Sequence, residues 1–247
     1  MSADPESRHA PCATVQKYPD TDVARVGGKN ASLGEMFNML GSAGIRVPDG
    51  FAVTAEAYRL FLSSNALAAK LQQTLDRLDT ISLANLAEVG ATCRALIASG
   101  QLPAPVSKAI LQAYAVLDPD HSISMAVRSS ATAEDLPTAS FAGQHESFLN
   151  VSGADDLLAA VQRCYVSLFN DRAIKYRIDN GFDHMQVALS AGIQRMVRAD
   201  LGSAGVAFTL DPESGNDQIV YITGAWGLGE NVVQGAVNPD EFHIFKA

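Results

Sequence analysis

The sequence predicts an α+β fold of two lobes, because helical patterns fill its first half and strand patterns fill its last part. Apolar residues recur at helical spacing over 31–40, 82–99 and 105–117. Short apolar stretches separated by turn residues follow from residue 187 onwards, among them 205–210 and 218–223. Helices gathered in one part of the chain and hairpin-like strands in another fit this mixed architecture better than a regular alternation of strand and helix.

Length and charge restrict the classes of protein to which the chain can belong. Its 247 residues, 47% of them hydrophobic, suffice to bury the core of one large domain or of two lobes. The 27 Asp and Glu outnumber the 18 Lys and Arg, giving a formal net charge of −9 without a basic cluster, so we expect no nucleic acid as a partner. No apolar run is long enough for a membrane span or a signal peptide, so we expect a cytoplasmic protein with no membrane partner.

Cysteines and histidines give no sign of a disulfide framework or a metal centre. Cys12, Cys93 and Cys164 are odd in number and far apart in the sequence, with no pair at C-x-x-C spacing. We interpret them as reduced thiols, with Cys93 and Cys164 packed on helices. Metal-ligand spacing is also missing among His121, His145, His184 and His243.

A first candidate site combines two glycines and a lysine at the entrance of the predicted 31–40 helix, where Asn30 is a good N-cap residue. Gly27 and Gly28 allow backbone conformations that bring the chain close to a ligand. Lys29 can direct its ammonium group toward a phosphate at the start of the helix. A capped helix that carries a surface lysine explains the same residues.

A second candidate is Arg128, which follows a predicted apolar strand at 124–127 and begins a loop of small residues over 128–140. A guanidinium near the edge of a core needs an anionic partner, and its planar fork suits a phosphate or a carboxylate. The partner is therefore either a ligand phosphate or the nearby carboxylate of Glu134 or Asp135.

Two further features carry weaker signals. Small residues that include Gly143, in a stretch around 141–151 predicted to be extended, suit a flap whose amides cover phosphates, although an ordinary edge hairpin also explains them. Gln194 lies in an apolar strand predicted at 187–197, where a polar side chain either contacts an adenine or is an ordinary hydrogen-bonded strand residue. The fingerprints of P-loop and dinucleotide-binding proteins are both missing.

Taken in order, these stretches make the chain resemble the N-terminal region of the phosphoenolpyruvate synthase family, from about Val23 to its end. Five motifs occur in the same order as in that family, and together they identify it more specifically than any single motif does. They favour the ligand-binding interpretations of Lys29 and Arg128. The motifs lie at 26–35, 127–137, 140–144, 167–173 and from 226–230 through 238–240.

The resemblance assigns a role to each candidate residue. It implies that Lys29 and Arg128 hold the triphosphate of ATP. Gly143 and Ser147 are expected to contact phosphate from the flap, and Gln194 is expected at the adenine hinge. These roles are positioning and charge neutralisation, which dominate the catalysis of phosphoryl transfer.

The resemblance also implies an ATP-grasp-like fold with ATP held between two lobes. We expect residues 1–14 to be a mobile tail, 15–193 to form the first lobe, and 194–247 to form the hinge and an incomplete second lobe. In this family ATP, pyruvate and water give phosphoenolpyruvate, AMP and phosphate through a phosphohistidine. The partners implied are ATP, a downstream phosphohistidine domain and a pyruvate-binding barrel, with Mg²⁺ as a cofactor.

The acidic Mg²⁺ ligands and the phosphorylated histidine of the family are expected outside this chain, which we interpret as truncated. We therefore expect the chain alone to bind ATP weakly and to form no AMP in response to pyruvate. Two alternatives remain, a sibling dikinase such as pyruvate phosphate dikinase or an antibiotic phosphotransferase, and a nucleotide-binding fragment without turnover. We also predict that Lys29 and Arg128 lie on opposite sides of one cleft, and that 128–144 is mobile without ligand.

Overall fold

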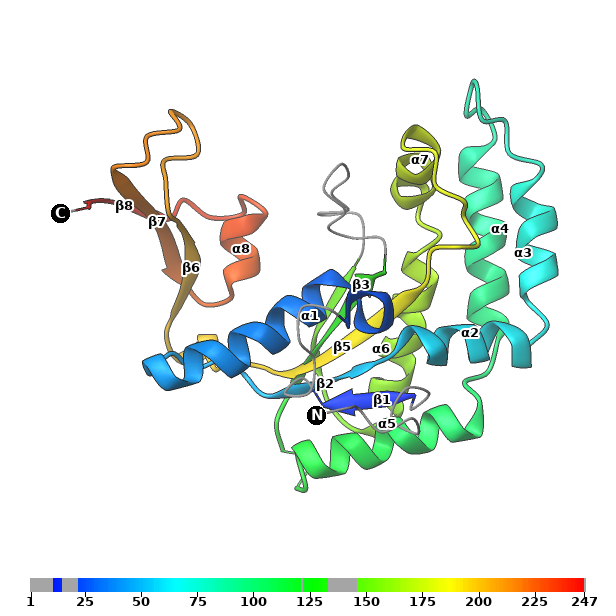
Figure 1. Ribbon diagram of the computed structural model, residues 1–247, viewed down its shortest axis with the longest axis horizontal. Coiled ribbons are helices and arrows are strands. Elements are labelled where there is room, and N and C mark those ends of the chain that lie inside the picture. The colour runs from blue at the N-terminus through cyan, green and yellow to red at the C-terminus, as the bar shows by residue number, and fades with distance from the viewer. Residues whose placement is uncertain (1–10, 15–21, 121, 133–145, 247) are drawn as a thin grey trace. The chain divides into compact units, whose positions relative to one another are not determined.

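A computed structural model describes the chain except for residues 1–10, 15–21, 121, 133–145 and 247 (Figure 1). It consists of two compact units, Met1–Met196 and Val197–Ala247, and each is described by itself. None of the helices in the described part of the chain is long and apolar enough to cross a membrane.

The first unit is built on a five-stranded antiparallel sheet with the strand order β1-β2-β5-β3-β4. The central strand β5 pairs with β3 from Arg195 opposite Met125 to Leu189 opposite Ala131. The strands are β1 (Cys12–Thr14), β2 (Gly50–Val53), β3 (Met125–Ala131), β4 (Ser147–Val151) and β5 (Leu189–Arg195).

The described residues of this unit contain seven helices, which pack on the sheet or on one another (Figure 1). They are α1 (Val23–Leu40), α2 (Ala55–Ser64), α3 (Ala68–Leu75), α4 (Leu86–Ser99), α5 (Ala104–Leu117), α6 (Ala154–Ser167) and α7 (Asp171–Asp179). A short 3-10 helix, Gly41–Ala43, follows α1.

The main apolar core lies on one face of the sheet. Side chains alternate between the two faces along a strand, and Phe51, Val127 and Ile193 point to the side on which α2 to α7 pack. Each is at most 1% exposed, and burial stabilises the fold by about 25 cal/mol for each Å² of apolar surface removed from water. The opposite face is covered by α1, whose Val26 and Ala31 pack against Ala52 of β2 in a separate small cluster.

The second unit contains a three-stranded antiparallel sheet with its second strand in the middle. Two neighbouring strands of this sheet approach each other closely at Gly205, where a Cβ would lie 1.9 Å from the carbonyl oxygen of Thr223. The elements are the 3-10 helix Ala199–Leu201, β6 (Ser203–Phe208), β7 (Ile219–Trp226), α8 (Gly229–Val233) and β8 (Asp240–Phe245).

The structure confirms a mixed composition of helices and antiparallel sheets, but several elements begin elsewhere than predicted. The helix predicted over 31–40 begins at Val23 and is kinked at Gly27. The prediction of an N-cap at Asn30 is wrong, because this residue lies inside α1 and its side chain bonds to other groups.

Two other boundaries differ for local reasons. The helix predicted over 82–99 begins at Leu86, because the Asp79 carboxylate accepts hydrogen bonds from the amides of Ile81 and Ser82 and holds a turn there. The expectation of a tail over 1–14 does not hold for Cys12–Thr14, which pair with β2.

The two cysteines expected on helices lie in the core. Cys93 of α4 and Cys164 of α6 are both free thiols and fully buried. This confirms that they lie on helices and pack as apolar residues in the main core.

A cation is also buried in this unit. The Arg177 side chain of α7 is 0% exposed, and its Nε donates a hydrogen bond to Nδ1 of His184 at 2.8 Å. One terminal nitrogen donates to the Leu168 carbonyl at 2.7 Å, and the guanidinium lies 5.6 Å from the centre of the Phe169 ring. Burial lowers the pKa of Arg177 to about 10, so the group remains charged at neutral pH.

Acidification should destabilise this unit through His184. Burial, and then the Arg177 charge, lower the pKa of His184 from 6.5 to about 4 in the folded chain. Between these pH values the unfolded chain binds more protons than the folded chain. The contribution of His184 to the free energy of unfolding is therefore complete above about pH 6.5 and is lost as the pH falls toward 4.

Urea denaturation at pH 7 and pH 5 measures this loss. The His184→Gln variant keeps an oxygen that can accept the hydrogen bond from Arg177 and does not titrate, so it should lose less stability on acidification than the wild type. An equal loss in both proteins would contradict the assignment to His184.

Candidate functional site

Three of the predicted site residues lie on one face of the first sheet. Arg128 of β3 is directly opposite Gly192 of β5 on one side and Ser147 of β4 on the other. Directly opposed residues in antiparallel strands point to the same face, and residues two apart in a strand do so as well. Arg128, Ser147 and Gln194 therefore share a face, and it is the face that α1 covers.

The kink of α1 brings the helix unusually close to β3. Gly27 has φ 74° and ψ 163°, a conformation that is open almost exclusively to glycine. A Cβ at this position would lie 2.2 Å from Oγ and 2.5 Å from the carbonyl oxygen of Ser130. The helix resumes after the kink, which places Gly28 and Lys29 in its first turn above the sheet face that carries Arg128.

Asn30 fixes this helix to the sheet. Its side chain is 3% exposed and donates to the Val26 carbonyl at 3.0 Å and to Oγ of Ser190 at 3.1 Å. The hydroxyl of Ser190 donates in turn to the Val53 carbonyl at 2.7 Å. Gly192 leaves room for this amide, because a Cβ there would lie 2.2 Å from Oδ1 of Asn30.

Sequence reasoning missed this positioning role of Asn30. A usable signal was present in the alternating small residues of the two paired strands, Ser130 in β3 with Ser190 and Gly192 in β5. Such a column of small side chains on one face indicates that another backbone packs directly on the strands.

The surroundings of Arg128 differ from the prediction. We expected it directly after a strand, but it lies in the middle of β3, because pairing with β5 continues as far as Ala131. It is the exposed residue in a strand whose other side chains are buried. Its alternative partners, Glu134 and Asp135, lie outside the described residues.

The remaining candidates have different environments. Lys29 is exposed and Ser147 is exposed at the start of β4. Gln194 is 8% exposed and donates from Nε2 to the Pro48 carbonyl at 2.9 Å, so part of its amide already has a partner. Gly143, and most of the segment 128–144 predicted to be mobile, lie outside the described residues. A shared cleft for Lys29 and Arg128 stays a prediction, although both belong to the side of the sheet that α1 covers.

Comparison with known proteins places this geometry in context. Residues 23–247 match the family model described as pyruvate phosphate dikinase, AMP/ATP-binding domain. The chain is 57% identical over 229 residues to a phosphoenolpyruvate synthase from Neisseria meningitidis serogroup B, covering 92% of this chain and 29% of that protein. It is 56% identical over 226 residues to one from Escherichia coli K12, covering 91% of this chain and 28% of that protein.

A more distant relative matches over a similar part of the chain. A probable phosphoenolpyruvate synthase from Methanocaldococcus jannaschii is 45% identical over 237 residues, which are 95% of this chain and 19% of that protein. The chain thus spans less than a third of the length of each of these relatives.

Replacing Gly27 tests the close approach of α1 to the sheet. Gly27→Ala should lower the free energy of unfolding by about 3 kcal/mol or more, because it combines a glycine-only backbone conformation with overlap against Ser130. Gly41→Ala is a matched control, because Gly41 has φ −57° and a Cβ there would meet nothing within 4 Å. The control should be neutral or stabilised by about 0.4–1 kcal/mol. Chemical denaturation of both variants measures the difference, and equal stabilities would contradict a close approach of α1 to β3 at Gly27.

Proposed function

The chain belongs to the family of pyruvate phosphate dikinase AMP/ATP-binding domains, and we propose that it is the ATP-binding part of a phosphoenolpyruvate synthase. In this proposal the chain holds ATP, and the phosphoryl group passes by way of a phosphohistidine to pyruvate. The balanced overall reaction is ATP, pyruvate and water giving phosphoenolpyruvate, AMP and phosphate. The phosphohistidine domain and the pyruvate-binding barrel are the proposed partners of the chain, and the cytoplasm is its proposed location.

The observation that carries the proposal is the shared sheet face of Arg128, Ser147 and Gln194, together with the start of α1 above it. An exposed arginine surrounded by buried strand residues has a fixed base and a side chain that reaches away from the core. Such a group can bind phosphate oxygens through two parallel hydrogen bonds. Ser147, directly opposite it, can add a hydroxyl donor to the same phosphate.

Lys29 supplies a second proposed charge for the triphosphate. It stands in the first turn after the Gly27 kink, where backbone amides and the positive end of the helix dipole favour an anion. Neutralising and aligning the phosphates is the main contribution that a protein makes to phosphoryl transfer. Gln194 is the proposed neighbour of the adenine, two residues before the boundary between the two units.

The proposed domain organisation follows the family. Residues 15–193 are the proposed first lobe and 194–247 the hinge and part of a second lobe of an ATP-grasp-like fold. The division of contacts after Met196 supports this proposal. Relatives at 45–57% identity that are named phosphoenolpyruvate synthase favour this enzyme over a sibling dikinase.

Mg²⁺ is proposed to bind together with ATP, and no ligands for it are assigned in this chain. Across the described ranges, no group of three or more His, Cys, Asp or Glu side chains could hold a metal ion. The described residues therefore do not fit a protein-held metal site, and we derive no step through the ion.

Nucleotide titration tests the proposed site. We expect Arg128→Ala and Lys29→Ala each to weaken binding of MgATP by roughly tenfold or more, because each removes a charge-assisted contact to phosphate. Arg128→Lys should be intermediate, since it keeps the charge and loses the planar fork. Isothermal titration calorimetry at high protein concentration gives the dissociation constants.

Matched controls are available on other elements of the same unit. Arg59→Ala in α2 and Lys108→Ala in α5 remove one exposed positive charge each and should leave binding unchanged. The proposal fails if Arg128→Ala is folded and binds MgATP as tightly as the wild type.

A further inference from the structure

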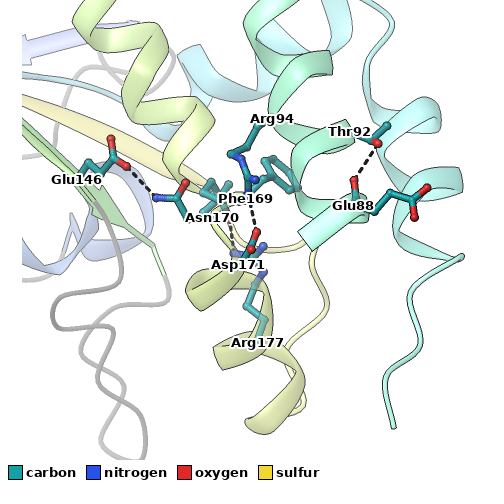
Figure 2. Close-up of polar contacts among 9 residues, drawn as sticks. Glu88, Thr92, Arg94, Glu146, Phe169, Asn170, Asp171 and Arg177 are labelled. Atoms are coloured by element: carbon teal, nitrogen blue, oxygen red, sulfur yellow. Dashed lines mark hydrogen bonds and ion pairs between the residues drawn. The ribbon is translucent and has the colours of Figure 1, made fainter. Parts of the chain in front are cut away.

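The loop between α6 and α7 is held by two arginines from different helices (Figure 2). Arg177 of α7 donates to the Leu168 carbonyl at 2.7 Å. Arg94 of α4 donates from Nη1 to the Phe169 carbonyl at 2.9 Å and to the Asp171 carboxylate at 2.7 Å. Two consecutive carbonyls of the loop are thus fixed by guanidinium groups.

The packing around this loop leaves it little freedom. The Phe169 ring is 1% exposed and lies beside the buried guanidinium of Arg177. Gly90 lets α4 approach, because a Cβ there would lie 2.5 Å from Oδ1 of Asp171. The residue between these fixed points is Asn170, which also precedes the first turn of α7.

Asn170 reaches from this fixed loop to the start of β4. Its Nδ2 donates to Oε1 of Glu146 at 3.2 Å, and Figure 2 shows this contact beside the Arg94–Asp171 pair. The backbone of Glu146 is held as well, because its carbonyl accepts from the Ser129 hydroxyl at 3.2 Å and from the Ser129 amide at 3.5 Å. Glu146 is therefore fastened at its side chain and at its main chain, immediately before Ser147.

This anchor matters because β4 is an edge strand. Among the described strands it pairs with β3 alone, and its register with β3 shifts between Met125 and Val127, at the end of β4 away from Ser147. Ser147 begins the strand opposite Arg128. A strand with one neighbour in the described sheet has ladder hydrogen bonds on one side only, so a contact that holds Glu146 adds to the placement of its first residue.

We propose that Asn170 is a positioning residue for the nucleotide site, acting through Glu146 on the placement of Ser147 beside Arg128. This inference rests on the proposed function, since it concerns the residues proposed to contact phosphate. In this proposal Asn170 does not itself contact the nucleotide. Its role is to hold the carboxylate of Glu146, and thereby the entry of β4, at a fixed distance from the α6–α7 loop.

The polarity of the contact makes a sharp test possible. Asn170→Ala removes the donor, and Asn170→Asp places two carboxylates within hydrogen-bond distance of each other, so the aspartate should be the more harmful change. Glu146→Gln keeps an oxygen that can accept from Asn170 and should be mild. The double variant Asn170→Asp with Glu146→Gln reverses donor and acceptor and should restore the contact.

Two measurements on the 247-residue chain separate this inference from the proposed function. Hydrogen exchange at the Ser129 amide, without nucleotide, reports the anchor directly, because that amide donates to the Glu146 carbonyl. Calorimetric titration with MgATP reports the consequence for binding. We expect Asn170→Ala to speed exchange and to weaken binding by roughly threefold to tenfold. Asn170→Asp should speed exchange and weaken binding more than Asn170→Ala does. The double variant should return the exchange rate and the affinity toward the wild-type values. The melting temperature should change little in all of these variants.

Asn180→Ala is the matched control. Its side chain donates to the Tyr176 carbonyl at the other end of α7 and is exposed, so neither measurement should change. The inference is overturned if Asn170→Ala has the wild-type exchange rate at the Ser129 amide and the wild-type affinity for MgATP. It is also overturned if the double variant is no closer to the wild type than Asn170→Asp in these two measurements. If Arg128→Ala leaves binding unaffected, the proposed function fails, while the exchange measurement still decides whether Asn170 holds the start of β4.

Discussion

The absence of two side chains, at Gly27 and Gly192, determines how closely α1 lies on the sheet. Each position has a neighbour 2.2 Å from where its Cβ would be. With α1 at this height, the short side chain of Asn30 reaches Ser190 directly and no water layer is required. A helix displaced outward by the width of a methyl group would break the hydrogen bond from the Asn30 amide to Ser190, at a cost of about 1–3 kcal/mol.

The close packing of α1 makes the two faces of the first sheet differ in composition. The face toward α2–α7 holds large apolar side chains such as Phe51 and Ile193 and provides most of the stability. The face under α1 carries glycine, serine and alanine, with Arg128 standing out as an exposed charge. The face proposed to bind the nucleotide can remain polar and sparsely filled because the opposite face supplies the core.

The sequence predicts which strands carry the candidate residues better than it predicts the geometry around them. Lys29 and Arg128 were identified as candidates, and the strands that carry Ser147 and Gln194 were expected at about the right places. The strand position of Arg128 was missed, because Ser129 and Ser130 resemble loop residues while tertiary pairing with β5 makes them strand residues.

The contacts that hold the site together were beyond sequence reasoning for a different reason. Asn170 and Glu146 lie 24 positions apart in the sequence and are joined by a hydrogen bond between two different elements. Asn30 bonds to Ser190 across 160 positions. Periodicity and capping rules describe near neighbours only. Pairs of this kind are decided by how helices and strands stack, and a single sequence contains no record of that stacking.

The buried cysteines of α4 and α6 have a consequence for the chemical reactivity of the chain. A thiol attacks alkylating reagents as the thiolate, and burial raises the pKa of Cys93 to about 11 and the pKa of Cys164 further. Both thiols are consequently shielded by geometry and by protonation while α4 and α6 stay packed. The rate of alkylation at either position therefore measures how often the core around that thiol opens, because reagent can enter only during such an opening.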